Sequence, residues 1–548
     1  MPPSPETKLL TRTLIFLILL TGPADGQHLH YEPGEWEFIP SIGAITSVSE
    51  GPDGLYFSTL DGLVYFDYVS QSLDHLPILN MGLPSHRLYH VCHDASTNGL
   101  WVVYDEGIAY RLPTDETWQS VSLLSLPDRF SGRAVTRVGG SFDGIWIDMD
   151  GVYTLFHSFS GGFIRQGIAP PQGIVDWNTS QAAFFEPPDL MGWITSGDWS
   201  THVQEFHGPG FLSTLPTLAF KDRFEQIWYG TDLGIFFRGD PYTRRLEPLQ
   251  VGIAPKPVIT LYIDNDRVWF ADNPFRREGI RPMREESYFL SVWDERISSW
   301  RYYSSMESEA IRDVGVNDIL RVGRELWLAT MQGIVLLDTR TDTWGFLGSR
   351  AGLRDQAVWD LERYGEEIFA ATARGIDRIR PSLRRVVPED SLALSPILEV
   401  YCLFSTGASI YAGTAGGVYE YHNEAAMGWR RVSDLPAVSL WSDEDQMFAV
   451  AHNRIHVRGK NEQNFTLFPA QARPEAKILE IKGSGSYIWL ATSTGAVMID
   501  RRDHRRYTFD RQDGLPSEVV YSVEPGSEWV WILTMNGVVR FNWSAHFD

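Results

Sequence analysis

Four arginines stand close together in one insertion of an acidic chain. The insertion spans residues 273–287, and the full chain carries a formal net charge of −23. Guanidinium groups bind carboxylates through paired hydrogen bonds, so this group could clamp a carboxylate-bearing glycan or an acidic peptide. The alternative is a solvated insertion in which three glutamates pair with the arginines. The four residues are Arg276, Arg277, Arg281 and Arg284.

A second long excursion, residues 156–190, holds the other candidate contact residue, Trp177. Its Pro-Pro pairs and its tryptophan are compatible with a loop that contacts a ligand. The same segment could instead be the remains of a decayed repeat. We predict Trp177 as a ligand-binding residue and keep both interpretations open.

Catalytic chemistry has weaker support. His86, His90 and His93 lie near one apolar segment and could act in a channel enzyme, but a structural role for each is the alternative. The chain contains no His-Glu-x-x-His, phosphate-binding loop, Cys-x-x-Cys pair or Gly-x-Ser-x-Gly context. We therefore predict a protein that is not an enzyme and that has no cofactor and no catalytic metal.

Three smaller features also favour structural interpretations. Asp148 and Asp150 resemble part of a calcium loop but lack its downstream Glu, which favours a solvated turn. Residues 483–486 read as a turn between strands, because no helix follows them. Cys92 and Cys402 each lie in an apolar strand, so we expect two buried thiols and no disulfide.

A repeated phrase supplies the elements that must position these residues. An aromatic or large apolar residue is followed by Thr three positions later and by Gly six positions later. The period of about 40 residues, with short apolar strands and tight turns, predicts a β-propeller of four-stranded antiparallel blades. The glycine suits a turn with positive φ, and the aromatics should fill the space between blades. The first residues of the phrase are Tyr56, Trp228, Trp327, Phe369, Tyr411, Trp489 and Trp531.

The repeat count predicts two tandem propellers. Adding the units at residues 101 and 146 and the degenerate units at 193, 269 and 448 gives about twelve blades, which exceeds the usual range for one ring. We expect six plus six blades, with an N-terminal propeller over residues 27–305 and a C-terminal one over 306–548. Five plus seven is the alternative. Residues 34–39 resemble an outer strand and could complete a blade that its own local sequence leaves short, in either ring.

Residues 1–26 resemble a secretory signal peptide, with Lys8 and Arg12 before the apolar run 14–20 and a small-residue cleavage site at Ala24. That run is too short to span a bilayer, and no later stretch approaches the required length. We therefore expect a secreted or periplasmic protein, monomeric or part of an envelope assembly. The acidic balance excludes nucleic acid as a partner.

The phrase Gly-Leu-Pro-Ser-x-x-Val at residues 514–520, followed by Trp-x-x-Thr-x-x-Gly-Val at 531–538, resembles the two-component regulator propeller repeat. That family builds paired sensor propellers of hybrid histidine-kinase systems and surface propellers associated with type IX secretion. The resemblance covers most of residues 35–545 and implies a double propeller. No stalk, membrane helix, kinase or sorting domain is recognised after the last repeat, so direct signalling by this polypeptide is not expected.

These observations favour a non-enzymatic, extracytoplasmic binding module whose partner is a glycan or an envelope protein. A polysaccharide lyase or hydrolase acting in a propeller channel is one alternative. A detached sensing module of a two-component system is the other.

Overall fold

The computed structural model describes residues 35–39, 42–74, 77–80, 82–115, 117–122, 134–181, 188–196, 199–208, 213–253, 258–272, 288–297, 299–304, 311, 315–387, 399–422, 428–473 and 475–547. The expected signal peptide (1–26) and the four arginines of the 273–287 insertion lie outside these ranges. Helical structure in the described part is confined to one-turn elements such as α2 (Pro77–Asn80). No helix in those ranges is long and apolar enough to cross a membrane.

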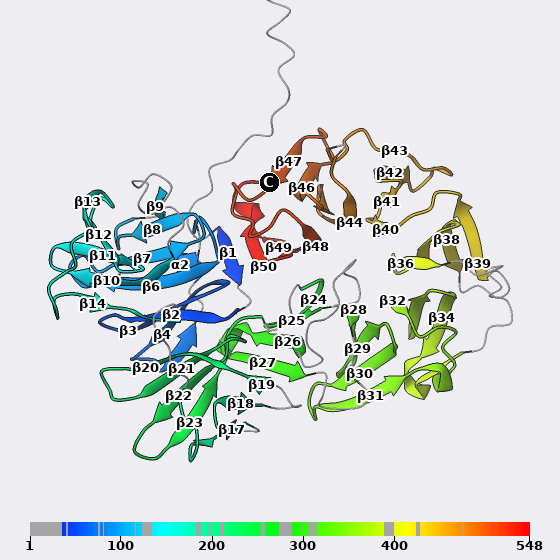
Figure 1. Cartoon of the computed structure of the whole chain (residues 1–548). Coiled ribbons are helices and arrows are strands. Elements are labelled where there is room, and N and C mark those ends of the chain that lie inside the picture. The colour runs from blue at the N-terminus through cyan, green and yellow to red at the C-terminus, as the bar shows by residue number, and fades with distance from the viewer. Residues whose placement is uncertain are drawn as a thin grey trace, which may run out of the picture.

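The described residues form twelve sheets, eleven of them with four or more strands, and the predicted β-propeller architecture is confirmed (Figure 1). Seven four-stranded antiparallel sheets form one group around a central channel. They are β24 (Thr260–Asp264), β25 (Arg267–Ala271), β26 (Tyr288–Asp294) and β27 (Ser299–Ser304); β28 (Val316–Val322), β29 (Glu325–Thr330), β30 (Gly333–Asp338) and β31 (Thr343–Leu347); β32 (Val358–Tyr364), β33 (Glu367–Thr372), β34 (Gly375–Arg380) and β35 (Arg385–Val386); β36 (Val400–Ser405), β37 (Ile410–Thr414), β38 (Gly417–His422) and β39 (Gly428–Ser433); β40 (Ser439–Ser442), β41 (Gln446–Ala451), β42 (Arg454–Gly459) and β43 (Thr466–Leu467); β44 (Ile478–Ser484), β45 (Tyr487–Thr492), β46 (Gly495–Asp500) and β47 (Arg506–Phe509); and β48 (Val520–Pro525), β49 (Trp529–Thr534) and β50 (Gly537–Asn542) with β1 (Trp36–Ile39).

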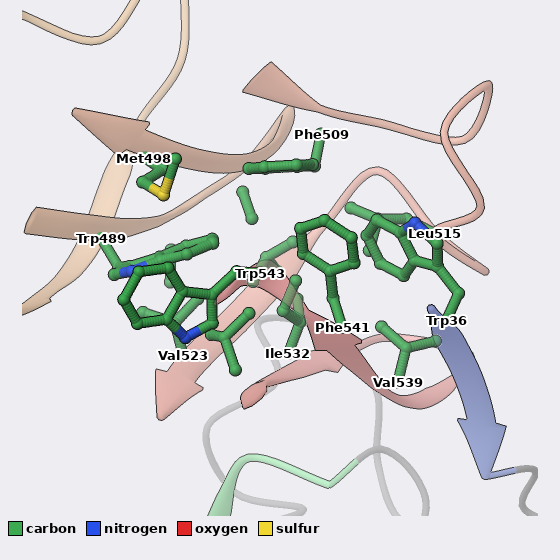
Figure 2. Close-up of a cluster of buried hydrophobic side chains, with 14 of the residues drawn as sticks. Trp36, Trp489, Met498, Phe509, Leu515, Val523, Ile532, Val539, Phe541 and Trp543 are labelled. Carbon is green, nitrogen blue, oxygen red and sulfur yellow. The ribbon is translucent and has the colours of Figure 1, made fainter. Parts of the chain in front are cut away.

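The N-terminal strand completes the last sheet of this group. β1 pairs antiparallel with β50, with Trp36 opposite Phe541 and Ile39 opposite Val538. Trp36 is 5% exposed and stacks on Phe541 with ring centroids 4.5 Å apart, inside a cluster that also contains Trp489 (Figure 2). This strand therefore covers the edge of β50 that its own sheet would otherwise leave unpaired.

The last sheet in turn contacts the first sheet of the group. The Arg540 guanidinium on β50 donates to Glu37 and, at 2.6 Å, to Glu295, which follows β26. Phe270 of β25 packs against Trp531 of β49, with ring centroids 6.1 Å apart. These contacts close the seven sheets into a ring.

The remaining five sheets lie on the N-terminal side, at the left of Figure 1. Short strands extend three of these sheets. The strands are β2 (Ile45–Glu50), β3 (Gly54–Thr59), β4 (Gly62–Asp67) and β5 (Ser72–Asp74), with β15 (Thr179–Ser180); β6 (Leu88–Asp94), β7 (Gly99–Tyr104), β8 (Gly107–Arg111) and β9 (Gln119–Ser122); β10 (Val135–Ser141), β11 (Gly144–Met149), β12 (Val152–Phe156) and β13 (Phe163–Gln166), with β14 (Asp176–Trp177); β17 (Ser200–His202), β18 (Glu205–His207) and β19 (Ser213–Thr214); and β20 (Pro216–Lys221), β21 (Ile227–Thr231), β22 (Phe236–Asp240) and β23 (Arg245–Leu249), with β16 (Ile194–Thr195).

The sheet of residues 260–304 was expected in the N-terminal propeller, but its first strand lines the same channel as the six sheets after it. We therefore propose a boundary near residue 255 in place of the expected one near 305, with five sheets before it and seven after it. The expected unit at Trp193 also differs, because Trp193 precedes the two-residue β16 and packs beside Tyr229.

The repeated Thr and Gly make one local structure, a clamp across the hairpin between the second and third strands. In the third sheet of the C-terminal group, the Thr372 hydroxyl donates to the Gly375 carbonyl at 2.7 Å and accepts from the Arg374 amide at 3.2 Å. Gly375 has φ of 116°, the left-handed region that glycine adopts at low cost. The same Thr-to-Gly bond recurs at Thr59, Thr330, Thr414, Thr492 and Thr534.

A second local structure recurs at the start of the first strands. The pairing register with the second strand shifts by one residue between Val316 and Asp318, between Val358 and Asp360, and at the matching place in most other sheets. Such a bulge re-aims the residues that follow it. In the C-terminal group, these residues line the channel.

Candidate ligand channel

The centre of the C-terminal ring is hollow. A cavity of about 570 Å³ is lined by the first strands of all seven sheets, β24, β28, β32, β36, β40, β44 and β48. A volume of this size is typical of small-molecule sites. Alternate residues of each first strand face the cavity, because residues two positions apart share one face of a strand. The apolar residues between them pack into the walls. Ile319, Leu361 and Ile481 are examples of these buried wall residues.

One level of the lining is a polar ring to which each strand contributes one residue, the third residue in five strands and the first in β24 and β40. Several of its side chains hold the neighbouring sheet by accepting a backbone N–H: Asp318 from Leu361 at 3.0 Å, and Asp360 from Leu403 at 2.7 Å. Glu480 accepts from the Val523 amide at 3.1 Å. The members of this polar ring are Thr260, Asp318, Asp360, Cys402, Ser439, Glu480 and Ser522.

Two positions further along each strand lies a second level, which is aromatic and charged. Lys482 is its only cation among the described residues, and its ammonium group pairs with Glu524 and, at 3.6 Å, with Glu480. The attraction of these carboxylates raises the pKa of Lys482, so this group is charged at any physiological pH. The members of this upper ring are Tyr262, Leu320, Glu362, Phe404, Trp441, Lys482 and Glu524.

Three carboxyl groups on adjacent strands crowd one side of the channel. Asp318 and Asp360 lie close enough for their charges to interact. Burial raises the pKa of both, and the Asp318 charge raises the pKa of Asp360 further. Burial, with a further contribution from Asp318, also raises the pKa of Glu362 to about 8. At neutral pH, this side of the channel therefore retains protons that exposed carboxyls would lose.

Aromatic side chains line the channel beside these carboxyls. Trp359, Tyr401 and Tyr521 occupy the bulged position at one end of their strands, and Trp441 and Phe404 lie at the other level. The indole N–H of Trp359 is buried and donates to no described acceptor. The channel thus combines hydrogen-bonding groups with aromatic faces, as binding sites for small polar ligands commonly do.

The N-terminal group of five sheets differs, because a short segment of the chain bonds to the first strands of three of them. In β14, Trp177 lies opposite Gly139 of β10, and in β15, Ser180 lies opposite Ser47 of β2. Asn178, between them, accepts from the Val138 amide at 2.9 Å and donates to the Val91 carbonyl on β6 at 3.0 Å. One short segment therefore bonds to the first strands of three sheets.

The candidate contact residue Trp177 belongs to this segment. Its side chain is half-buried, and the Arg137 guanidinium lies over its ring, 4.3 Å from the centroid. A ligand role for Trp177 remains a prediction. Arg276, Arg277, Arg281 and Arg284 also remain predictions, because they lie outside the described residues.

The three histidines have structural surroundings. His90 is buried, its Nε2 bonds to the Val135 carbonyl at 2.9 Å, and burial lowers its pKa to about 4. His86 also has a pKa lowered to about 4 by burial and packs on Phe38 with centroids 4.2 Å apart. His93 stacks on Tyr56 and bonds to Asn98. Each of the three histidines contacts different residues, and the three side chains do not converge on one site.

The smaller features also have local explanations. Asp148 pairs with Arg137 at 3.0 Å and accepts the Gly151 amide at 2.9 Å, as a turn residue does. Cys92 and Cys402 are free thiols, and burial raises the pKa of both. Cys402 belongs to the polar ring of the channel.

The channel carboxyls were not among the residues predicted from the sequence. The signal was present, because Asp360 and Glu362 are two positions apart in a first strand, as are Glu480 and Lys482. Charged residues at alternate positions of an innermost strand indicate a polar channel. Aligning the first strands of the repeats would have shown them as a set.

No family model and no curated protein matches the chain. Solved structures do match it. PorZ, a surface component of the type-IX secretion system of Porphyromonas gingivalis, aligns with a TM-score of 0.56 at 10% identity, covering 93% of this chain and 87% of PorZ. The extracellular domain of the hybrid two-component system BT3049 from B. thetaiotaomicron aligns with a TM-score of 0.43 at 17% identity, covering 92% and 68%. At these identities the likeness concerns the fold, and the chain shares the β-propeller fold of the classes of protein that its repeat resembles.

Proposed function

We propose that this protein is an extracytoplasmic, non-enzymatic binding module, and that the C-terminal channel receives part of a glycan or of an envelope protein. The observation that carries the proposal is the contrast between the two rings. The first strands of three N-terminal sheets bond to residues 176–181, whereas the first strands of all seven C-terminal sheets surround a cavity of about 570 Å³. Propeller channels with convergent polar and aromatic groups are well suited to binding.

Affinity capture from native envelopes tests this proposal. The full chain would be immobilised beside a variant that lacks two aromatics of the channel end, Tyr401→Ala with Tyr521→Ala. We expect the wild type to recover a reproducible glycan or protein and the double variant to recover at least tenfold less. Tyr242→Ala is the matched control, because Tyr242 is 83% exposed on the N-terminal ring. Equal recovery by the wild type and a folded double variant would contradict a binding role for the channel.

One observation favours a second function, hydrolysis or elimination of a polysaccharide. Burial raises the pKa of Asp318 and of Asp360, and a carboxyl with a raised pKa can serve as a general acid. Turnover of acidic and neutral polysaccharides by the wild type, compared with Asp360→Asn, tests this alternative. Product formation that the variant loses would support the enzyme, and a panel without turnover would favour the binding module.

A further inference from the structure

The charges that line the C-terminal channel do not balance. Five carboxyl groups face one ammonium group, that of Lys482. Lys482 is already engaged by Glu480 and Glu524. Within the described part of the chain, no lysine or arginine lies within ion-pair distance of the other three, and the charge of Lys482 only partly offsets the raised pKa of Asp318 and of Glu362. These three carboxyls, Asp318, Asp360 and Glu362, lie on the adjacent strands β28 and β32.

Such a group is costly to ionise without a counter-charge. Each carboxylate added to a buried site repels those already present, so an empty channel holds protons in place of charges. The pKa of Glu362, raised to about 8, is consistent with this. A positively charged ligand group would replace a proton and offset the repulsion between the ionised carboxyls. The carboxylates would then be ionised and paired with the ligand.

The lining indicates which kind of cation fits. No set of three acidic, histidine or cysteine side chains in the described part of the chain is placed to hold one metal ion. Trp359, Tyr401 and Trp441 instead line the cavity, and aromatic rings attract organic ammonium groups by cation–π interaction. The cavity also exceeds the size of a bare ion and suits an ammonium group carried on a larger molecule.

We propose that the ligand group which enters the C-terminal channel carries an alkylammonium charge, and that this charge is bound by Asp318, Asp360 and Glu362 between aromatic walls. This inference rests on the proposed binding function and adds the chemical class of the ligand. An amino sugar and a lysine side chain share this chemistry, and the test below separates them.

Binding should then be linked to proton release. Glu362 is ionised in about one molecule in 100 at pH 6 if its pKa is about 8, and in about nine of ten at pH 9. Affinity for an alkylammonium group should rise up to about 100-fold between these pH values, and should fall again above about pH 10 as a lysine-type amine loses its charge. The titratable or charged groups that share the channel with Glu362 are Tyr262, Asp318, Asp360, Tyr401, Cys402, Glu480, Lys482, Tyr521 and Glu524.

Isothermal titration calorimetry of the full chain tests the inference with two pairs of probes. Each pair consists of an amine and its neutral acetyl derivative: lysine amide with Nε-acetyl-lysine amide, and glucosamine with N-acetylglucosamine. We expect at least one amine to bind tenfold or more tightly than its acetyl derivative, with proton release seen as a dependence of the heat on buffer ionisation enthalpy. The amine that binds identifies the source of the ammonium group.

Glu362→Gln should lower amine affinity at least tenfold at pH 8.5 and abolish most of the pH dependence. Glu366→Gln is the matched control, because Glu366 is exposed in the turn that follows the same strand. Thermal melting of both variants verifies that each is folded.

Equal binding of amines and acetyl derivatives, or unchanged amine binding in folded Glu362→Gln, would overturn the inference. Calcium or magnesium binding that Glu362→Gln abolishes would overturn it too, in favour of a metal. If no amine binds, while Tyr401→Ala with Tyr521→Ala still loses envelope capture, the ammonium inference fails and the proposed binding function stands.

Discussion

Replacing Glu362 by Gln should stabilise the protein at alkaline pH and leave its stability unchanged at acid pH. Burial and the neighbouring Asp318 raise the pKa of Glu362 from 4.5 to about 8 in the folded chain. Between these two values the folded state binds more protons than the unfolded state, so the free energy of unfolding of the wild type falls as the pH rises. The loss begins near pH 4.5 and is complete above pH 8.

The size of the effect follows from the same shift. Each pKa unit corresponds to about 1.4 kcal/mol, so 3.5 units set an upper bound of about 5 kcal/mol. The side chain lines a cavity and is only half-buried by exposure, so solvent screening should reduce this to about 2 kcal/mol. Gln has a similar shape and no charge, so it should not show the loss.

Urea denaturation of wild type, Glu362→Gln and the exposed control Glu366→Gln would be measured at pH 5, 7 and 9. We expect the variant to exceed the wild type by about 2 kcal/mol at pH 9 and to match it at pH 5. The control should follow the wild type throughout. A difference between Glu362→Gln and the wild type that is constant from pH 5 to pH 9 would refute a carboxyl with a raised pKa at this position.

Four further substitutions test the fold. Thr372→Val should lower the free energy of unfolding by about 1–3 kcal/mol, measured by urea denaturation, because the hairpin clamp loses one buried and one partly buried hydrogen bond. Gly417→Ala should lower the free energy of unfolding by about 3 kcal/mol or more, since φ is 129° and an added Cβ would lie 2.1 Å from a backbone carbonyl oxygen. Gly365 has φ of 63° and open space around it, so Gly365→Ala should lower the same quantity by about 1–2 kcal/mol. Trp36→Ala should lower the free energy of unfolding by about 3–5 kcal/mol and promote aggregation in light scattering, because it empties a buried cluster and loosens the strand over β50. Cys402 should resist iodoacetamide at pH 8 until the chain is denatured, because burial raises the pKa of its thiol; rapid labelling of the native protein would argue for an open thiolate.

Local repeats could be predicted from the sequence, and ring closure could not. The spacing of aromatic, Thr and Gly marks the hairpin between two strands, and that hairpin depends on contacts within seven residues. The pairing of β1 with β50 joins residues about 500 positions apart. The sequence indicated that residues 34–39 would complete a blade, but it contained nothing to choose the ring. The expected division near residue 305 was uncertain for the same reason, since membership of a ring is a matter of which first strands surround one channel.

The degenerate unit shows a second limit. Trp193 heads a unit that lacks the Thr and Gly of the repeat, and it stands in a turn before β16 and fills space beside Tyr229. A tryptophan supplies the same buried area in a strand or in a turn, so its presence alone could not distinguish them. The channel residues were missed because motif searches look for adjacent residues, whereas the polar ring collects one residue from each of seven sheets.

Different groups form hydrogen bonds to the first strands in the two groups of sheets. This difference indicates which channel residues have a structural role and which do not. In the N-terminal group of sheets, Asn178 and its neighbours supply hydrogen-bonding partners to the first strands of three sheets. In the C-terminal ring, Asp318 and Asp360 accept hydrogen bonds from backbone amides of the next sheet. This structural role is sufficient to explain the presence of both carboxyls.

Glu362 has no such structural reason, because no amide of a neighbouring sheet donates to it in the described part of the chain, and its burial beside Asp318 works against stability at neutral pH. A residue that lowers stability and supports no other sheet is best explained by the ligand that it binds. Among the channel carboxyls, Glu362 is therefore the one whose removal should improve folding and impair binding together.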